Sequence, residues 1–487
     1  MKKIIFTLLV TLFSFTSNVI AQGDADFSGG NGTQENPWQI RTAVQLDNVR
    51  NNLSATEMKF FKLMNDIDLK DIAETNNWMP YKDGASSSAA YMDFDGNGFV
   101  IKNMHIEGKT ANYQSFAGFI WGTIRNLGLV NVYINCPAVG GIGAFVGYVG
   151  SGTPSNNHYR TGSIENCYAT GYILGGGGTV GGIAGSIGRP SNNGTTSFVK
   201  NCYFSGELHN VYAGSSSTVR TGGIAGLVLA NTTAANNTIS PIQNCYATGF
   251  YRTGKGRIGG IVGETEHTIE NSVAFADLEE EGSTANSMGM IVGYCDNTGT
   301  TSKFGKVLNS WSYDGVKMRR GGEWVTPGYF NTPGTGTISP VDGSLKDLTY
   351  LSNAVNYYVE LGFPMAGETA VWSQQLRSSI YPQLLWVASR SDAQDIDGLT
   401  NIPDITTGTN PQKEHQEPAV IANGNLIIFK DVTEALKVSV YDAKGALLKT
   451  FNQTVDGASI VLSDNNKLLL VKMTSQSGKV ITRKLIK

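Results

Sequence analysis

Ile164-Glu165-Asn166-Cys167-Tyr168-Ala169-Thr170-Gly171 is followed by Gly181-Gly182-Ile183-Ala184-Gly185, and both motifs recur along the middle of the chain. The first motif opens with Ile or Val, any residue, and then Asn. A β-branched residue beside a polar one is typical of a strand with one buried face. This regular recurrence predicts a stack of repeats, in which each unit buries its apolar face only against its neighbours. The pattern occurs seven times, at Asn103, Asn126, Asn166, Asn201, Asn244, Asn271 and Asn309.

The glycine-flanked motif falls between copies of the first one, for example at residues 222–226 and 259–263. It predicts a short apolar strand at a tight corner, where Gly adopts the necessary dihedrals at low cost. The shortest spacings between repeat Asn residues, 23 and 27 residues, match one coil of about 20–27 residues. We therefore predict an all-β fold, a right-handed parallel β-helix (a solenoid) followed by a small antiparallel β-sandwich.

The position after each repeat Asn is small or apolar in every copy, as an inward-facing slot requires. Cys167, Cys202 and Cys245 occupy three of these slots, where a free thiol packs as a small hydrophobe. We predict a stacked column of reduced Cys. A disulfide remains an alternative, although the total of five Cys is odd.

The units at 259–263 and 164–171 resemble those of GLUG-motif β-helix proteins, which are bacterial surface proteins of the adhesin-like type. The resemblance covers about residues 30–320, and the openings at 37–40 and 94–98 also fit it. It implies a repetitive β fold and a position on the cell surface. It implies no catalytic residues, because that family shares none and a fold alone does not define an activity.

Composition changes along the chain predict six segments. Lys2 and Lys3 precede a short apolar run at 4–15, as in an export signal, and that run is too short to span a membrane. We expect a signal peptide at 1–21, an N-terminal cap and first coils at 22–100, Gly-rich solenoid repeats at 101–320, a C-terminal cap of the solenoid at 321–387, a linker at 388–420 and a β-sandwich at 421–487.

The C-terminal segment resembles the sorting domain of type IX secretion at two places, Val438-Ser439-Val440-Tyr441-Asp442 and Arg483-Lys484-Leu485-Ile486-Lys487. That resemblance implies export machinery as a partner, outer-membrane attachment, and a secreted or cell-surface location in a Gram-negative bacterium. The sequence departs from that family at 467–472, where a Gly-x-Tyr is usual. An ordinary surface-anchoring or binding sandwich therefore remains an alternative.

Charge and spacing argue against several function classes. The net charge is −3 without a long basic run, so no nucleic-acid partner is expected. Residues 93–98 begin like a calcium loop, but Met104 stands where a bidentate Glu is required, so a structural turn is expected. No His or Cys has metal-ligand spacing. The prediction is therefore no metal, no cofactor and no catalysis, with a β-helix polysaccharide lyase or hydrolase as the less favoured reading.

An aromatic row is the candidate ligand-binding feature. If the residue after each Asn points inward, the next one points outward, and this position holds Tyr168, Tyr203, Tyr246 and Trp311. Such a row offers rings on which sugars or partner side chains stack. Alternatively, loops cover the row or the rings lie in the core. We predict an exported cell-surface protein with an adhesion or binding role and an unknown glycan or protein ligand; the alternative is a carbohydrate-binding protein of a glycan-uptake system.

Overall fold

The computed structural model divides into two compact units, residues 1–405 and 406–487, and each is described by itself. The predicted signal peptide at 1–21 lies outside the described residues. The described residues are 26–54, 56–71, 77–82, 90–150, 161–188, 196–211, 219–230, 240–282, 287–296, 305–325, 343–399, 419–423, 426–430, 436–442, 446–454, 459–461, 468–475 and 480–486.

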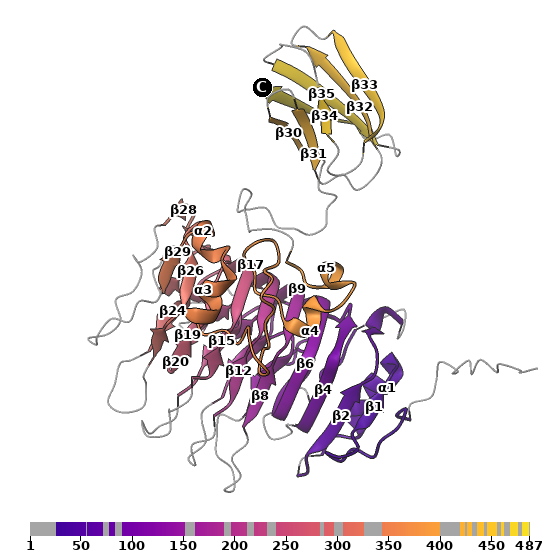
Figure 1. The fold of residues 1–487 in the computed structure, drawn as a ribbon, viewed down its shortest axis with the longest axis vertical. Coiled ribbons are helices and arrows are strands. Elements are labelled where there is room, and N and C mark those ends of the chain that lie inside the picture. Colours follow the sequence, from indigo (N-terminus) through magenta and orange to yellow (C-terminus); the bar gives the residue numbers. More distant parts are fainter. Residues whose placement is uncertain are drawn as a thin grey trace, which may run out of the picture. The chain divides into compact units, whose positions relative to one another are not determined.

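The first unit consists mainly of short strands that pair in parallel with the equivalent strands of the next repeat (Figure 1). The first ladder carries the Ile-x-Asn motif. It comprises β1 (Trp38–Ile40), β2 (Lys59–Leu63), β4 (Ala90–Lys102), β6 (Ala117–Cys136), β8 (Gly162–Glu165), β12 (Phe198–Lys200), β16 (Ile242–Gln243), β20 (Thr268–Glu270) and β25 (Lys306–Leu308).

The second ladder continues each repeat after its Asn, and it also uses the far halves of β4 and β6. Its other strands are β3 (Ile67–Asp68), β5 (His105–Glu107), β9 (Tyr168–Gly175), β13 (Tyr203–Asn210), β17 (Tyr246–Thr253), β21 (Val273–Ala274), β22 (Asp277–Glu280), β26 (Trp311–Tyr313), β27 (Met318–Arg320) and β29 (Ser344–Lys346). The short β28 (Glu323–Trp324) pairs antiparallel with β27.

Two further ladders complete the repeats. The third begins on β6 and continues through β7 (Val146–Val149), β11 (Ala184–Ile187), β15 (Ala225–Val228), β19 (Val262–Thr265) and β24 (Val292–Cys295). The fourth comprises β10 (Thr179–Gly181), β14 (Arg220–Gly222), β18 (Arg257–Gly259) and β23 (Ser287–Gly289). The all-β prediction is therefore confirmed, with large parallel sheets as its main component.

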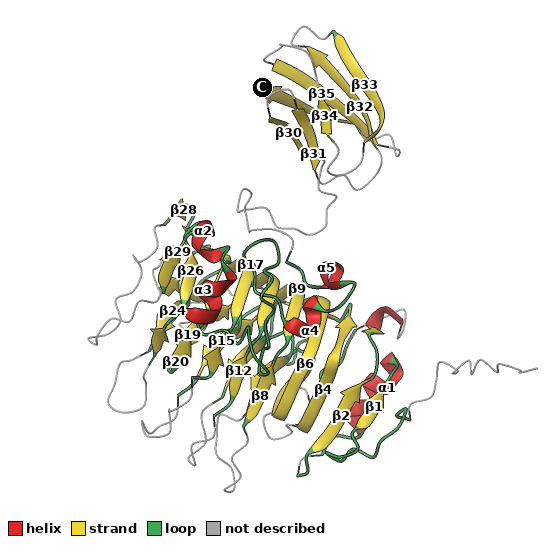
Figure 2. Ribbon diagram, in the orientation of Figure 1, coloured by secondary structure: helices red, strands yellow, loops and turns green. Residues whose placement is uncertain are grey.

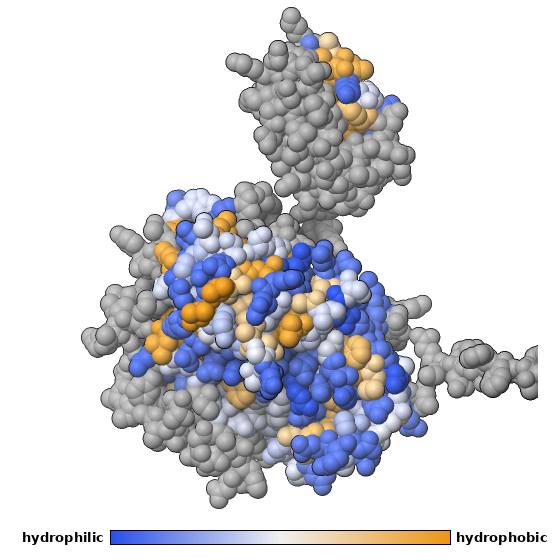
Figure 3. Space-filling view, viewed as in Figure 1, coloured by the Kyte–Doolittle hydropathy of each residue, from blue (hydrophilic) through white to orange (hydrophobic). Residues whose placement is uncertain are grey.

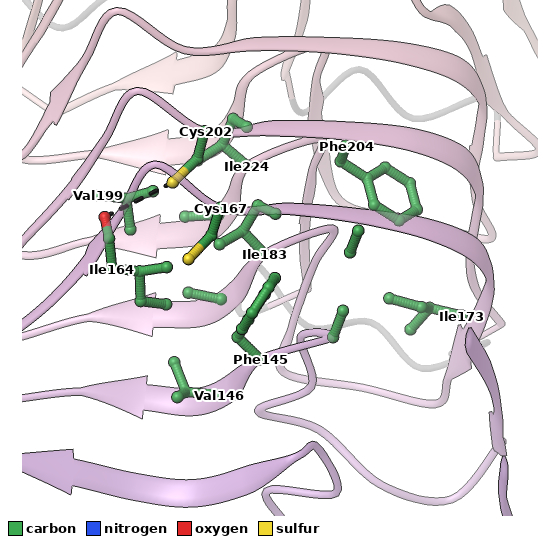
Figure 4. Packing of buried hydrophobic residues seen from close by; sticks show 14 of the residues in the cluster. Phe145, Val146, Ile164, Cys167, Ile173, Ile183, Val199, Cys202, Phe204 and Ile224 are labelled. Atoms are coloured by element: carbon green, nitrogen blue, oxygen red, sulfur yellow. Dashed lines mark hydrogen bonds between the residues drawn. The ribbon is translucent and has the colours of Figure 1, made fainter. Parts of the chain in front are cut away.

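Residues between the ladders form the main hydrophobic core. Ile164, Val199 and Ile242 lie opposite one another in register, and all three are fully buried. Figure 4 shows Ile164, Cys167, Ile183 and their equivalents in the next repeat pointing into this shared interior. Successive side chains of a strand point to opposite faces. The β-branched residue of the motif therefore faces inward and its polar neighbour faces outward.

The repeat Asn residues form the corner between the first and second ladders. Each has a positive φ, from 39° at Asn309 to 60° at Asn103, a region that Asn tolerates better than other residues with side chains. The Nδ2 of Asn201 donates to Oδ1 of Asn166 at 3.0 Å, and that of Asn244 donates to Asn201 at 3.1 Å. Each Asn therefore has two roles: its backbone forms the corner, and its side chain hydrogen-bonds to the adjacent repeat.

One of the seven motif copies lies in a different register. Ile101 pairs with Leu129, so Asn103 stacks on Asn131 at 2.6 Å and not on Asn126. Asn126 instead donates to Asp95 at 3.1 Å. Asn131 has a φ of 57° and follows Leu129-Val130, so it is an additional member of the pattern that the Ile/Val rule misses.

The glycine-flanked motif is a corner, as predicted, but for a different physical reason. Gly182, Gly223 and Gly260 do not have positive φ. A Cβ on Gly182 would lie 2.2 Å from the carbonyl oxygen of Gly223, and one on Gly260 would lie 2.2 Å from that of Met290. Glycine is needed there because successive repeats approach too closely for any side chain.

In the described residues helices are few and short, and Figure 2 shows them at the N-terminal end of the first unit and along one face of it. Thr42 caps the first helix by accepting from the backbone of Gln45. Asp347 caps α2 in the same way through Tyr350. The helices are α1 (Ala43–Asn48), η1 (Val49–Asn51), η2 (Leu69–Asp71), α2 (Leu348–Leu351), α3 (Ala354–Val359), α4 (Leu385–Ala388) and α5 (Ala393–Ile396).

Residues 347–399, here called the strap, lie along the outer face of the second ladder. At one end, Asn309 donates to the carbonyl of Glu360 at 3.0 Å. At the other end, Arg390 donates to both oxygens of Asp66, at 3.0 and 2.6 Å. The strap therefore connects the last repeats to the first ones across the whole ladder (Figure 1).

The strap differs from the cap and linker expected for this part of the chain. A cap at 321–387 was expected to close the end of the stack, but most of this segment covers its side. The predicted linker at 388–420 begins inside the strap, where Ile396 and Leu399 are buried. Composition suggested a linker because the apolar residues there are few, yet those few are the ones that pack.

The second unit contains two antiparallel sheets. One has the order β30 (Ala419–Asn423), β31 (Leu426–Lys430), β34 (Ser459–Val461). The other has the order β33 (Leu447–Thr454), β32 (Leu436–Asp442), β35 (Leu468–Ser475), β36 (Val480–Ile486). The sequence predicted an antiparallel β-sandwich at 421–487, and β30 begins two residues before that bound, at Ala419. Alternating apolar residues between turn residues are a strong local signal for such strands.

We expect Trp372→Ala to destabilise the first unit by about 3–5 kcal/mol, because this side chain is fully buried between the strap and the second ladder. Val355→Ala is the control: Val355 lies on α3 of the same strap but is 59% exposed. Figure 3 shows apolar surface in the region of α3. The effect of Val355→Ala should stay within about 0.5 kcal/mol. Urea unfolding followed by tryptophan fluorescence measures both, and equal effects would contradict a packed strap.

We expect Asn201→Ala to destabilise the stack more than Asn201→Gly. Both remove two amide hydrogen bonds, each contributing about 1 kcal/mol. Only Ala also strains the backbone, since φ is 53° at this position, which adds about 1–2 kcal/mol. Thermal unfolding of the two variants gives the order directly; an Ala variant as stable as the Gly variant would rule out the backbone role.

Candidate binding groove

The predicted aromatic row is buried. Tyr168, Tyr203 and Tyr246 have no exposed surface, and Trp311 is 3% exposed. Strap residues cover them: Trp386 lies 5.6 Å from the Tyr168 ring and Trp372 lies 5.7 Å from that of Tyr246. The row does point away from the main core, but it forms a second core with the strap. Its assignment as a ligand-binding surface was therefore wrong.

Stacking geometry gives a second reason against ligand binding by this row. The rings of Tyr168 and Tyr203 lie 4.8 Å apart with an interplanar angle of 11°, and those of Tyr203 and Tyr246 lie 4.9 Å apart at 7°. Because these rings stack face to face in register, their faces contact one another and only their edges remain for a ligand. Burial also raises the pKa of Tyr203 well above its usual value.

The Cys column lies in the main core. Cys167, Cys202 and Cys245 are free and fully buried, as are Cys136 and, almost entirely, Cys295. The Sγ of Cys202 donates to the carbonyl of Ile164 in the preceding repeat at 3.6 Å, as Figure 4 shows. Burial raises the pKa of Cys202 well above that of a free thiol, which disfavours the nucleophilic thiolate. The column is a structural element of the core.

A groove of about 460 Å³ lies on the outer side of the first ladder near its N-terminal end. Phe61, Phe94 and Ile124 point into the core, so their strand neighbours point outward into this groove. It is lined by Gln34, Glu35, Pro37, Phe60, Phe61, Lys62, Asp93, Asp95 and Arg125. Its volume falls in the range of small-molecule sites.

Ion pairs organise the groove. Arg125 Nη1 lies 2.5 Å from Asp93 Oδ1, and Nη2 lies 3.5 Å from Asp95 Oδ2. Asp95 also accepts from the backbone of Asn97 at 2.8 Å, at the irregular part of β4 where the pairing register shifts. Burial raises the pKa of Asp93, and the positive charge of Arg125 offsets part of that shift. Asp93 is therefore easier to protonate than a fully hydrated aspartate.

This site could not be identified from the sequence alone. Residues 93–98 were expected to form a turn, but they lie within β4, where the pairing register shifts between Asp95 and Phe99 and Asn97 has a φ of 53°. Their spacing gave no connection with Phe60 or Arg125. A signal was present: Lys62, Asp95 and Arg125 occupy the same outward slot in successive repeats, with alternating charge. The degenerate copy Phe94-Asp95-Gly96 hid that alignment because it lacks the Asn.

The described ranges contain neither a candidate metal site nor a candidate membrane-spanning helix. No group of three His, Cys, Asp or Glu side chains there could hold a metal ion. Within the same part of the chain, no helix combines the length and apolar character needed to cross a bilayer. His267 is buried and its pKa is lowered to about 4, mainly because burial disfavours the charged ring. Its Nδ1 accepts from the backbone of Thr268, so it has a structural partner.

Comparisons with known proteins give two informative similarities, although no protein-family profile matches this sequence. The chain is 38% identical over 136 residues to a "Putative Gly-rich membrane protein" of Evansella cellulosilytica, covering 26% of this chain. It spans only 15% of the length of that relative. It also resembles a solved structure named "putative immunoglobulin A1 protease" from Bacteroides ovatus, at 29% identity and a TM-score of 0.58.

The second similarity extends over 74% of this chain and 95% of the Bacteroides ovatus chain, so it includes most of the architecture described above. Another structure, named "IgA1 Protease", aligns at 15% identity with a TM-score of 0.33, which is too weak to support an argument. The prediction that this protein is not an enzyme is therefore corrected: a protein of similar sequence and fold carries the name of a protease. The spacing of residues along the sequence could not reveal a relation to a protease, because spacing identifies only catalytic motifs that are already known.

Proposed function

We propose that this chain is an exported protein of the bacterial cell envelope that binds an extracellular macromolecule in the groove between Phe60, Asp93 and Arg125. The groove is the observation that carries this proposal. It combines an aromatic ring with charged groups held in place by a rigid parallel sheet, the arrangement expected of a binding site on a preformed scaffold. We propose that this scaffold is a right-handed parallel β-helix of the GLUG-motif type; the parallel in-register ladders support the stacking of repeats that such a fold requires.

An envelope location is supported by the similarity to a Gly-rich membrane protein and by the export signal expected at 1–21. The second unit has the antiparallel strands expected of a sorting domain. We infer that residues 406–487 direct the chain to the exterior of a Gram-negative outer membrane through type IX secretion, leaving the first unit to bind an unknown partner and act in adhesion.

We expect deletion of 406–487 to abolish display of the protein on intact cells while leaving the first unit folded, because the two units are separately compact. Protease accessibility on whole cells measures display, and thermal unfolding of the purified variant measures folding. Full surface display of the shortened chain would contradict the sorting role.

Proteolysis is the second candidate function, favoured by the similarity to the structure named for an immunoglobulin A1 protease. Within the groove, Asp93 is the residue suited to general acid catalysis, because burial raises its pKa while the neighbouring Asp95 lies on the same outward face. Two carboxyl groups in different environments can take separate acid and base roles.

We expect the full-length mature protein to bind immunoglobulin A1 and, if the second candidate is correct, to release fragments that mass spectrometry can identify. Asp93→Asn should then reduce cleavage by about 100-fold or more, since acid–base groups contribute about 10²–10⁴. Tyr358→Ala, on the distant α3, is the control. Cleavage that is unaffected by Asp93→Asn would exclude the groove as the catalytic site.

A further inference from the structure

We propose that the groove at Phe60 is a binding site for an uncharged carbohydrate chain. This inference rests on the proposed binding function of the groove and names the class of its ligand. Three observations carry it: an unstacked aromatic ring, a mixed set of hydrogen-bonding groups, and a nearly balanced charge.

Phe60 differs from the other aromatic residues on the ladders. The Tyr column uses its ring faces internally, and the outward rings of His105, Tyr133 and Tyr172 also stack, with centroids 4.8 and 5.6 Å apart. Within the described residues, Phe60 stacks on no other ring, because its ladder neighbour is Asp93. It is half-buried and lines the groove, so a ring face is available to a flat apolar ligand surface. The apolar face of a sugar ring meets that requirement.

The groups around Phe60 suit hydroxyl groups. A hydroxyl both donates and accepts hydrogen bonds. The groove offers donors from Lys62, Arg125 and the Gln34 amide, and acceptors from Glu35, Asp93 and Asp95. Because Arg125 is already oriented by both aspartates, its remaining N–H groups are preorganised for a ligand.

The charge of the groove distinguishes between neutral and charged ligands. The lining contains two cationic residues, Lys62 and Arg125, and three acidic ones, Glu35, Asp93 and Asp95, for a formal net charge of −1 when all five are ionised. An anionic polymer would meet repulsion here, whereas an uncharged chain would not. An extended peptide would bind most readily to an open sheet edge, but β2 and β4 are paired on both sides. A neutral glycan therefore fits the groove better than either alternative.

The ladder also suggests how a longer chain would lie. The row that starts at Phe60 continues through Asp93 and Thr123 to Ser163, which is only 6% exposed, and then to Phe198 on β12. Four strand steps of about 4.8 Å place Phe198 about 19 Å from Phe60. Phe198 is half-buried and, in the described part of the chain, stacks on no other aromatic ring. Only a polysaccharide long enough to follow the stacking direction past the nearly buried Ser163 would reach both rings, whereas a short oligosaccharide would reach only one.

The test uses full-length mature protein on an array of neutral and acidic glycans, with immunoglobulin A1 as a protein probe, followed by calorimetric titration of the strongest ligands. We expect binding of neutral glycans and a loss of about ten-fold in affinity for Phe60→Ala. Phe198→Ala should weaken only the long chains. Tyr358→Ala removes an exposed ring elsewhere and should change nothing, and unchanged thermal unfolding must show that each variant is folded.

Asp93→Asn tests the charge argument, because it brings the net charge of the groove to zero and should improve binding of acidic glycans. Wild-type preference for acidic glycans would overturn the inference. Binding of immunoglobulin A1 that requires Phe60, without any glycan binding, would also overturn it but would leave the proposed function standing. If no ligand depends on Phe60, both proposals fail.

Discussion

In-register parallel stacking is the constraint on which the rest of the structure depends. Neighbouring strands lie about 4.8 Å apart, so each side chain has its own equivalent from the adjacent repeats as its nearest neighbour. A residue type is acceptable only if it can pack against copies of itself. Asn satisfies this condition with an amide that donates to one neighbour and accepts from the other, as Asn201 does. Cys, Ile and Val satisfy it by filling the core.

The same constraint decides where a ligand can bind. Identical aromatic residues in one column stack on one another, so the most regular aromatic columns are the least able to offer ring faces. Charged residues of one sign would repel one another, and the outward slot accordingly alternates through Lys62, Asp95, Arg125 and Glu165. A binding site therefore arises where the repeat is broken, and the groove around Phe60 lies in the least regular repeats.

The strap shows how a repetitive stack acquires long-range order. Each repeat contacts only its neighbours, so nothing in the ladders themselves links the first repeats to the last. The strap makes this link, from Glu360 beside Asn309 to Arg390 beside Asp66. It also covers the Tyr column, whose apolar rings would otherwise form an exposed patch of the kind that promotes association. The strap therefore both covers the side of the stack and links its two ends.

The sequence by itself determined the repeated strands, the inward slots after each Asn and most strands of the second unit, because these depend on residues close together in the chain. It also indicated that Tyr168, Tyr203 and Tyr246 share one outward column. Only the tertiary structure decided that the strap, more than 100 residues later, buries that column, and that Asn103 stacks on Asn131. It also brought Phe60, Asp93 and Arg125 into one groove. Local patterns specify which side of a strand a residue faces, whereas packing between distant segments decides what covers that side.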